Sequence, residues 1–109
     1  MHSKRKGYRV ERKIRMILEK FGWIVTRAGA SLGEADLICL KDKRCILLQI
    51  KSTNKKTFYY YGYNKPIFQG FQFFLVVDFG YNKIKVLQPT NKVVVSDGQT
   101  INTFLESYK

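Results

Sequence analysis

Four polar residues of types that take part in phosphodiester chemistry are Glu11, Asp36, Gln49 and Lys51. The last three belong to one stretch, GEADLICLKDKRCILLQIKST, at positions 33–53. Carboxylate and amide oxygens are ligands for hard divalent cations. A lysine beside them can orient a water molecule and offset developing negative charge. The combination predicts a metal site for cutting phosphodiester bonds.

The stretch has the pattern of a β-hairpin, which determines how these residues meet. Two β-rich runs flank the polar tetrad 41–44, which is typical of a tight turn. With the loop centred on its two middle residues, Asp36 lies opposite Gln49, and directly opposed residues point to one side of a sheet. Lys51 lies two places beyond Gln49 and shares that side. We therefore expect three polar groups to converge at the open end of the hairpin.

Two alternatives remain open for this hairpin. The runs are almost wholly apolar on both faces, which is typical of strands in the centre of a sheet, and an ion pair of Asp36 with Lys51 marking the strand ends is the plainer interpretation. A loop of odd length would slip the register and turn Asp36 to the side away from Gln49.

Composition and charge restrict the class of protein. The 109 residues are enough for a single domain over 1–109, and a hydrophobic fraction of 45% predicts a folded chain. Twenty Lys and Arg against eight Asp and Glu give a net charge of +12, which favours a nucleic-acid partner. A generic lysine-rich surface of a heat-adapted protein is the alternative, but such surfaces usually gain Glu together with Lys.

Neither a membrane nor a cysteine-based metal site is expected. No apolar run reaches spanning length and no signal-peptide pattern opens the chain, so we expect a cytoplasmic protein associated with the nucleoid. Cys39 and Cys45 both fall inside predicted central strands, and we interpret them as core thiols. With His2 as the single histidine, the sequence offers no His/Cys cluster.

An amphipathic helix over 4–21 is predicted by apolar residues spaced three and four apart, and Gly22 is a suitable terminator. Glu11 sits at the border of the apolar stripe, where it can reach a site beside the sheet. The alternative is a surface ion pair with Arg15 at i+4. The crowded basic residues at this end suit phosphate contacts better than a solvated face, and they are Lys4, Arg5, Lys6, Arg9, Arg12, Lys13 and Arg15.

The remaining pattern predicts strands alternating with turns and a closing helix. After a strand at 23–27 comes a small-residue connection at 28–33, and an aromatic cluster at 58–63 follows the hairpin. We interpret these aromatics as core or interface packing, with stacking on exposed bases as the alternative. The other predicted elements are the hairpin strands 35–40 and 45–52, a short irregular or helical piece at 66–72, strands at 73–79, 83–88 and 93–95, and a helix at 100–108. The order indicates an α+β domain with a mixed sheet.

The first half of the chain resembles the archaeal-type Holliday junction resolvases of the PD-(D/E)xK nuclease superfamily. The pattern of that family is a basic RKG-type start, a Glu on the first helix, an Arg and a Ser-containing loop, an Asp opening the second strand and a Glu-x-Lys on the third. Position by position, Glu11 matches the helix Glu, Ser31 the loop Ser, Asp36 the strand Asp and Lys51 the Lys. The combination is more specific than any single element. The resemblance implies a restriction-endonuclease-like core, a central mixed β-sheet flanked by helices.

Two departures from the family pattern bear on function. Gln49 stands where the family usually has Glu, so the resemblance implies a cation bound by Asp36, Gln49 Oε1, the backbone carbonyl of Ile50 and Glu11, with weaker affinity. The family also has a helix after the Lys strand, where this chain has its aromatic-rich stretch. Both departures also suit another nuclease of the superfamily, such as a nicking, mobile-element or restriction-like enzyme. A non-catalytic nucleic-acid-binding module on the same fold is the third alternative.

The resemblance also implies cofactor and partners. It predicts a Mg²⁺-dependent endodeoxyribonuclease, with Mn²⁺ as a substitute ion, in which Lys51 orients or deprotonates the attacking water and Glu11 holds a second ion or a metal-bound water. The expected substrate is branched or four-way-junction DNA, and paired incisions require a homodimer. The residues expected to contact the DNA backbone are Lys4, Arg5, Lys6, Arg9, Arg12, Arg27 and Ser31.

Overall fold

The structure is a computed structural model that describes residues 2–29 and 33–108, with side chains from Gly7 onward. Two helices and nine strands follow one another along the described chain. In order they are α1 (His2–Lys20), β1 (Ile24–Arg27), β2 (Leu37–Lys41), β3 (Arg44–Ser52), β4 (Thr57–Tyr59), β5 (Ile67–Phe68), β6 (Phe71–Asp78), β7 (Ile84–Leu87), β8 (Lys92–Val94), β9 (Gln99–Thr100) and α2 (Ile101–Glu106).

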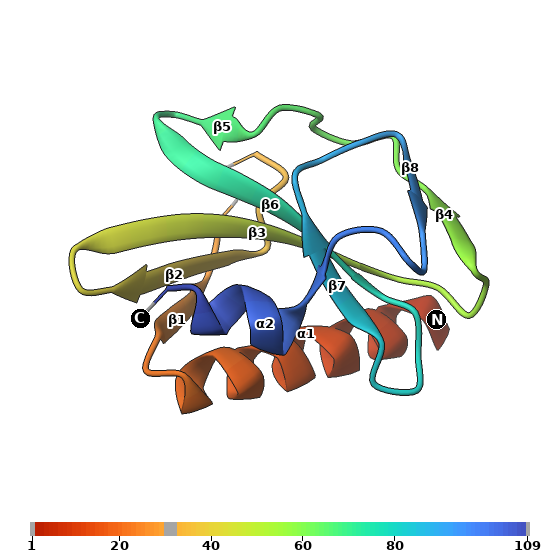
Figure 1. Cartoon of the computed structure of the whole chain (residues 1–109), viewed down its shortest axis with the longest axis horizontal. Helices are drawn as coiled ribbons and strands as arrows, with labels where there is room; N and C mark the ends of the chain where they lie inside the picture. Colours follow the sequence, from red (N-terminus) through yellow and green to blue (C-terminus); the bar gives the residue numbers. More distant parts are fainter. Residues whose placement is uncertain (1, 30–32, 109) are drawn as a thin grey trace.

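A mixed seven-stranded sheet forms the centre of the molecule (Figure 1). Its order is β1-β2-β3-β6-β7-β9, with β5 paired to the beginning of β6, and β3 runs parallel to β6 while the other pairs are antiparallel. Strands β4 and β8 form a separate antiparallel pair. The predicted α+β class with a central mixed sheet is confirmed, and β4, β5 and β9 are additions to the predicted elements.

Both helices cover the same face of the sheet (Figure 1). The apolar stripe of α1 contributes Ile14 and Leu18, and α2 contributes Phe104 and Leu105 to the same buried cluster. Helix α1 ends in a Schellman motif, because Gly22 has a φ of 90° and Trp23 N–H donates to Leu18 O over 3.1 Å. The predicted stop at Gly22 is therefore confirmed. The sheet residues in this cluster include Leu37, Cys39, Ile46, Leu48, Val76, Ile84 and Val86.

The opposite face of the sheet carries two smaller apolar clusters. One contains Leu47 and Phe73, and the other contains Leu75 and Tyr60. The connection between the parallel strands β3 and β6 passes over this face and contains β4 and β5, with no helix among its residues 53–70, all of which the structure describes. The helical alternative for 66–72 is wrong, because this segment is the hairpin of β5 with β6.

The β2–β3 hairpin has the predicted register. Leu40 pairs with Cys45, and the ladder continues to Leu37 opposite Leu48. Asp42 and Lys43 have φ values of 48° and 67°, so both turn residues are left-handed, as a two-residue type I′ turn requires. The even loop length keeps the paired residues from Leu37 to Leu48 on their predicted faces.

The structure also bears on the predictions for the cysteines and the aromatic segment. Cys39 is buried and Cys45 is half-buried, both free, and burial raises the pKa of the Cys39 thiol to about 12. In the aromatic segment, Tyr60 is fully buried whereas Tyr61 is 87% exposed, so core packing accounts for only part of this cluster. No helix among the described residues is long and apolar enough to cross a membrane.

Candidate active site

Asp36 lies where the regular β2–β3 ladder ends. Its backbone N–H donates to Leu48 O over 2.7 Å, and its Oδ2 accepts the backbone N–H of Ile50, also over 2.7 Å. The carboxylate thus takes a strand N–H at the open end of the hairpin, which fixes its orientation. Burial raises the pKa of Asp36, while the Ile50 hydrogen bond and the charges of Lys51 and Arg27 act in the opposite direction.

Lys51 and Gln49 occupy β3 beside this carboxylate. The predicted closeness of Asp36 and Lys51 is consistent with the influence of the Lys51 charge on the Asp36 pKa. Gln49 and Lys51 alternate with Ile50, so they share the sheet face that lies away from the helices. Their parallel neighbours on β6 are Leu75 and Val77. Gln49 is 6% exposed and Lys51 is exposed, so the pair extends from the interior to the surface.

Gln49 carries an unusual polar atom. Its Oε1 is buried and has no hydrogen-bond partner among the described residues. An unpaired buried amide oxygen costs free energy unless something supplies a positive charge or a donor. The donor set therefore fits a hard cation, with the Asp36 carboxylate, Gln49 Oε1 and the backbone carbonyl of Ile50 as oxygen ligands. Within residues 2–29 and 33–108, no three His, Cys, Asp or Glu side chains gather around one point, so any such site depends on neutral oxygens.

Glu11 is held by a partner other than the one expected from helix spacing. Arg27 Nε on β1 lies 2.8 Å from Glu11 Oε1, and the Glu11 side chain is 14% exposed. The alternative pairing with Arg15 at i+4 is not the one observed. Arg27 is therefore paired with Glu11, and its positive charge also lowers the pKa of Asp36.

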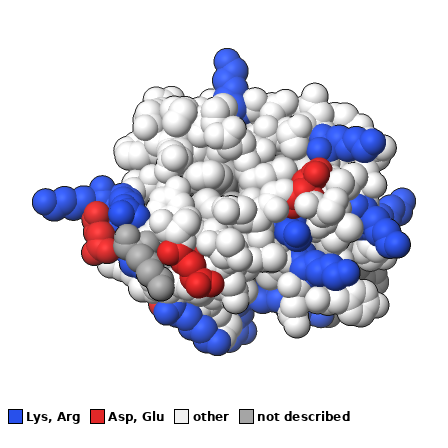
Figure 2. Space-filling view, viewed as in Figure 1, with Lys and Arg blue, Asp and Glu red and all other residues white. Residues whose placement is uncertain are grey.

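The predicted DNA contacts are described only in part. Arg9 and Arg12 are exposed on α1, and Arg27 is 60% exposed. Lys4, Arg5 and Lys6 belong to α1, but their side chains lie outside the described part, and Ser31 lies outside the described residues. Figure 2 shows a wide uncharged area in the middle of one face, with Lys and Arg side chains around its rim.

Two residues near the candidate site, Glu34 and Tyr60, were not singled out from the sequence. Glu34 Oε1 accepts the backbone N–H of Tyr63 over 2.9 Å. The buried Tyr60 hydroxyl has a pKa raised to about 12, first by burial and then by the negative charges of Glu34 and Asp36. The signal for Glu34 was available, because it precedes Asp36 by two positions in the GEAD sequence. Its contacts with residues near 60 could not be read from spacing.

The fold and this arrangement define the class of protein. A mixed sheet carrying an Asp at the open end of a hairpin, with Gln-x-Lys on the next strand, is a restriction-endonuclease-like nuclease core. The chain belongs to a particular family within this class, since residues 2–64 match the archaeal Holliday junction resolvase (Hjc) family. It is therefore a structure-specific nuclease, a hydrolase acting on DNA, and the family implies dependence on a divalent metal.

A solved structure agrees on the fold. Hjc from Archaeoglobus fulgidus, a Holliday junction resolvase from an archaeal hyperthermophile, superposes with a TM-score of 0.69 over 93% of this chain and 96% of that chain. The sequence identity is 14%, so the likeness concerns the fold. No curated protein sequence matches this chain.

Proposed function

We propose that this chain cuts four-way DNA junctions by Mg²⁺-assisted hydrolysis at Asp36, Gln49 and Lys51. The observation that carries the proposal is the buried, unpartnered Oε1 of Gln49, on the β3 residue next to Ile50, whose N–H holds the Asp36 carboxylate. When bound, the cation would stabilise negative charge on the scissile phosphate and on the leaving oxygen. Mn²⁺ would substitute for Mg²⁺.

The residues of the chain have separate tasks in this proposal. Asp36, fixed by the Ile50 N–H, presents a carboxylate in a partly buried setting, where its attraction to a cation is screened less than in water. Lys51, exposed at the edge of the same face, orients the attacking water and offsets charge on the phosphate. Gln49 contributes an oxygen without charge, so cation affinity should be lower than for a carboxylate.

Glu11 and Arg27 form the border of the proposed site. Glu11, already paired with Arg27, comes from the helix-covered side of the sheet, whereas Gln49 and Lys51 point to the other face, so Glu11 would act at the border of the site rather than as a ligand of the cation. Arg27 has further N–H donors for a phosphate oxygen. The basic end of α1 would dock the duplex through phosphate contacts, with Arg9 and Arg12 as its described exposed members.

We also propose that the active particle is a homodimer built from one such domain per chain. A four-way junction is resolved by paired incisions, and a two-fold particle places two identical sites on two strands. The mass in solution, measured by light scattering after gel filtration, should be twice 12.8 kDa. A monomer that remains monomeric on junction DNA would contradict this part of the proposal.

The proposal is tested by cleavage of labelled substrates. A four-way junction, a linear duplex and a single strand are incubated with Mg²⁺ or with a chelator. Cation-dependent cutting of the junction alone is the expected result. Cutting of all three substrates would favour a nicking or restriction-like nuclease, and binding without cutting would indicate a non-catalytic module.

The site assignment needs its own variants. Lys51→Ala should lower the cleavage rate about 100- to 1000-fold, the usual effect of removing one charge-stabilising group. Junction binding should stay close to that of the unaltered protein. Lys20→Ala, an exposed lysine in the last turn of α1, is the control and should cut normally. If the Lys51 variant cleaves like the control, the assignment of the site is wrong.

A further inference from the structure

Glu34 lies among residues that cover the face of the sheet on which Gln49 lies. Its Oε1 accepts the Tyr63 N–H over 2.9 Å, which ties the loop before β2 to the aromatic segment. Tyr63 packs against the apolar cluster of Ala35, Leu47 and Phe73. Leu47 precedes Gln49 by two positions on β3, so the two residues share this face.

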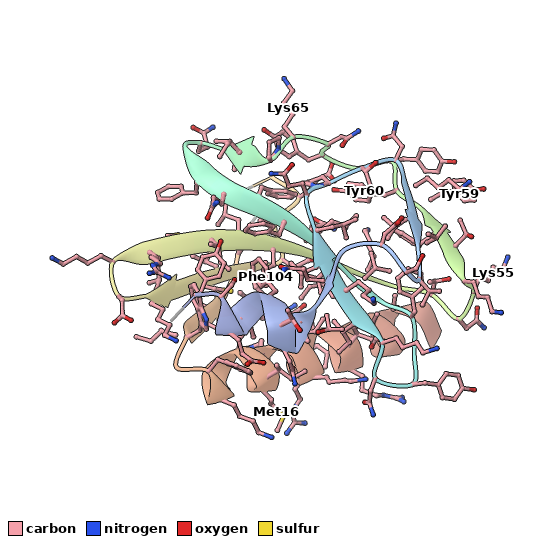
Figure 3. All side chains as sticks on the ribbon, viewed as in Figure 1. Met16, Lys55, Tyr59, Tyr60, Lys65 and Phe104 are labelled. Carbon is pink, nitrogen blue, oxygen red and sulfur yellow. The ribbon has the colours of Figure 1, made fainter. Side chains whose placement is uncertain are left out.

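Tyr60 approaches the same position from the other side. It packs with Leu75 and Val77, which are the β6 neighbours of Gln49 and Lys51. Tyr60 is 1% exposed, and its buried hydroxyl lies toward the Glu34 carboxylate, which helps to raise the pKa of that hydroxyl. Figure 3 shows Tyr60 within the outline of the molecule and Tyr59 at its edge. The segment 60–63 therefore crosses over Gln49.

Gly62 allows the carboxylate and the hydroxyl to meet there. A Cβ at this position would fall on Glu34 Oε1 and would lie 2.6 Å from the Tyr60 hydroxyl oxygen. Both oxygens therefore share the space above a residue that has no side chain. Burial, the Glu34 carboxylate and, less strongly, the charge of Asp36 raise the pKa of the Tyr60 hydroxyl.

We infer that Glu34 supplies the second carboxylate of the cation site, replacing the charge that Gln49 lacks, and that Tyr60 is the positioning residue that orients it. The inference rests on the proposed function. Gln49 gives a buried oxygen with no partner, 94% of its surface being covered, and Glu34 gives a full negative charge on the same face. The two carboxylates of Glu34 and Asp36, from the segment before β2, and the Gln49 amide from β3 make an oxygen set suited to Mg²⁺ or Mn²⁺.

A carboxylate at Glu34 would compensate for the uncharged amide at position 49. A site with Asp36 as its single carboxylate leaves most of the cation charge unbalanced, which lowers affinity. The Glu34 carboxylate, two residues before Asp36 in the loop that leads into β2, would restore that balance. The Tyr63 N–H fixes one oxygen of Glu34, and the adjacent Tyr60 hydroxyl restricts the rotation of its carboxylate.

The test is the affinity for Mn²⁺ in the absence of DNA, measured by calorimetry. Glu34→Gln should weaken Mn²⁺ binding by at least about 10-fold, because losing a charged ligand should cost no less than losing a group that only supports one. The substitution keeps an oxygen that can accept the Tyr63 N–H, so the fold should be retained. Glu106→Gln, an exposed acid on α2, is the matched control and should bind as the unaltered protein does.

A rescue variant separates ligation from general charge. Adding Gln49→Glu to the Glu34→Gln protein should restore Mn²⁺ affinity, because the carboxylate returns to β3. Tyr60→Phe should weaken binding by less than Glu34→Gln does. Equal Mn²⁺ affinity of the Glu34→Gln and unaltered proteins would overturn the inference, as would failure of the rescue.

Asp36→Asn distinguishes a failure of the Glu34 inference from a failure of the proposed function. If Asp36→Asn abolishes Mn²⁺ binding and junction cleavage while Glu34→Gln changes neither, the inference fails and the proposed function stands. If Asp36→Asn also has no effect, or if the unaltered protein binds no Mn²⁺, the proposed site itself is wrong.

Discussion

The backbone N–H of Ile50 donates to Asp36 Oδ2 over 2.7 Å, so the carboxylate is held by the residue that separates Gln49 from Lys51. The hydrogen bond fixes the relation between the two strands at the position where the ladder ends. It offsets only part of the free-energy cost of burying the charge, since the pKa of Asp36 remains raised. The buried, ionised carboxylate of the proposed site therefore lowers the stability of the folded protein.

Asp36→Asn is the first prediction, because it separates function from stability. Cleavage should fall below detection, since the variant cannot supply the charge that holds the cation. In the presence of chelator at neutral pH, the melting temperature should rise by a few degrees, because the asparagine oxygen can accept the Ile50 N–H without a buried charge. Thermal unfolding followed by circular dichroism measures the difference.

The pH dependence of this difference provides the control. A raised folded-state pKa means that the contribution of Asp36 to stability is fully present below the unfolded value of 3.8 and is lost as the pH rises through the folded value. The advantage of the Asn variant should therefore vanish below about pH 3.8. A variant that is less stable than the unaltered protein at neutral pH would contradict the assignment.

Arg27→Gln is the second prediction, because Arg27 has both a structural partner and an expected phosphate contact. The ion pair with Glu11 is 60% exposed on the arginine side and should contribute no more than about 1 kcal/mol to stability. Loss of a phosphate contact should weaken binding to all junction sequences alike and reduce the slope of log affinity against log salt by about 1. Fluorescence anisotropy at several salt concentrations measures that slope.

Lys92→Gln, on β8, controls for the loss of one positive charge. An unchanged salt slope in the Arg27 variant, together with reduced stability, would restrict Arg27 to holding Glu11.

The hairpin was predictable because its information is local. Two apolar runs on either side of a four-residue polar stretch determine the turn, and an even loop length then determines which side chains share a face. The relation of Asp36, Gln49 and Lys51 follows from this counting. What counting misses is the side-chain hydrogen bond of Asp36 to Ile50, because the ladder departs from regular pairing at its last residue.

The segment after β3 was less predictable because its contacts are distant in sequence. Strand β4 is three residues long and pairs with β8, and β5 is two residues long, so neither shows a clear alternation. Glu34 contacts Tyr63 across 29 positions. Tyr60 and Tyr61 are adjacent residues of the same type, yet the first is buried and the second is exposed. A run of tyrosines does not indicate which of its members is buried.

Gly62→Ala is the third prediction. The added methyl group would overlap Glu34 Oε1 and the edge of the Tyr60 ring, so the exposed Glu34 side chain must swing away from the Tyr63 N–H and the buried Tyr60 ring must shift. Overpacking of this kind usually costs about 1–3 kcal/mol. Urea unfolding should show this loss. Gly7→Ala, which meets no atom within 4 Å on α1, should leave stability equal or higher, since alanine favours the helix. Equal stability of the Gly62 variant and the unaltered protein would mean that Glu34 and Tyr60 move aside without a cost in free energy.

Tyr60→Phe is the last prediction and concerns alkaline stability. Burial and the nearby carboxylates raise the pKa of Tyr60 from 10.0 to about 12, so the folded protein favours the neutral hydroxyl. This contribution to stability is fully present below pH 10.0 and is lost as the pH rises through about 12. The free energy of unfolding of the unaltered protein should therefore fall more steeply over this range than that of Tyr60→Phe. Tyr61→Phe, at an 87% exposed position, is the matched control and should follow the unaltered protein. Denaturant titrations at a series of alkaline pH values measure the three curves, and parallel curves for the two variants would show that Tyr60 ionises as freely in the folded chain as in the unfolded one.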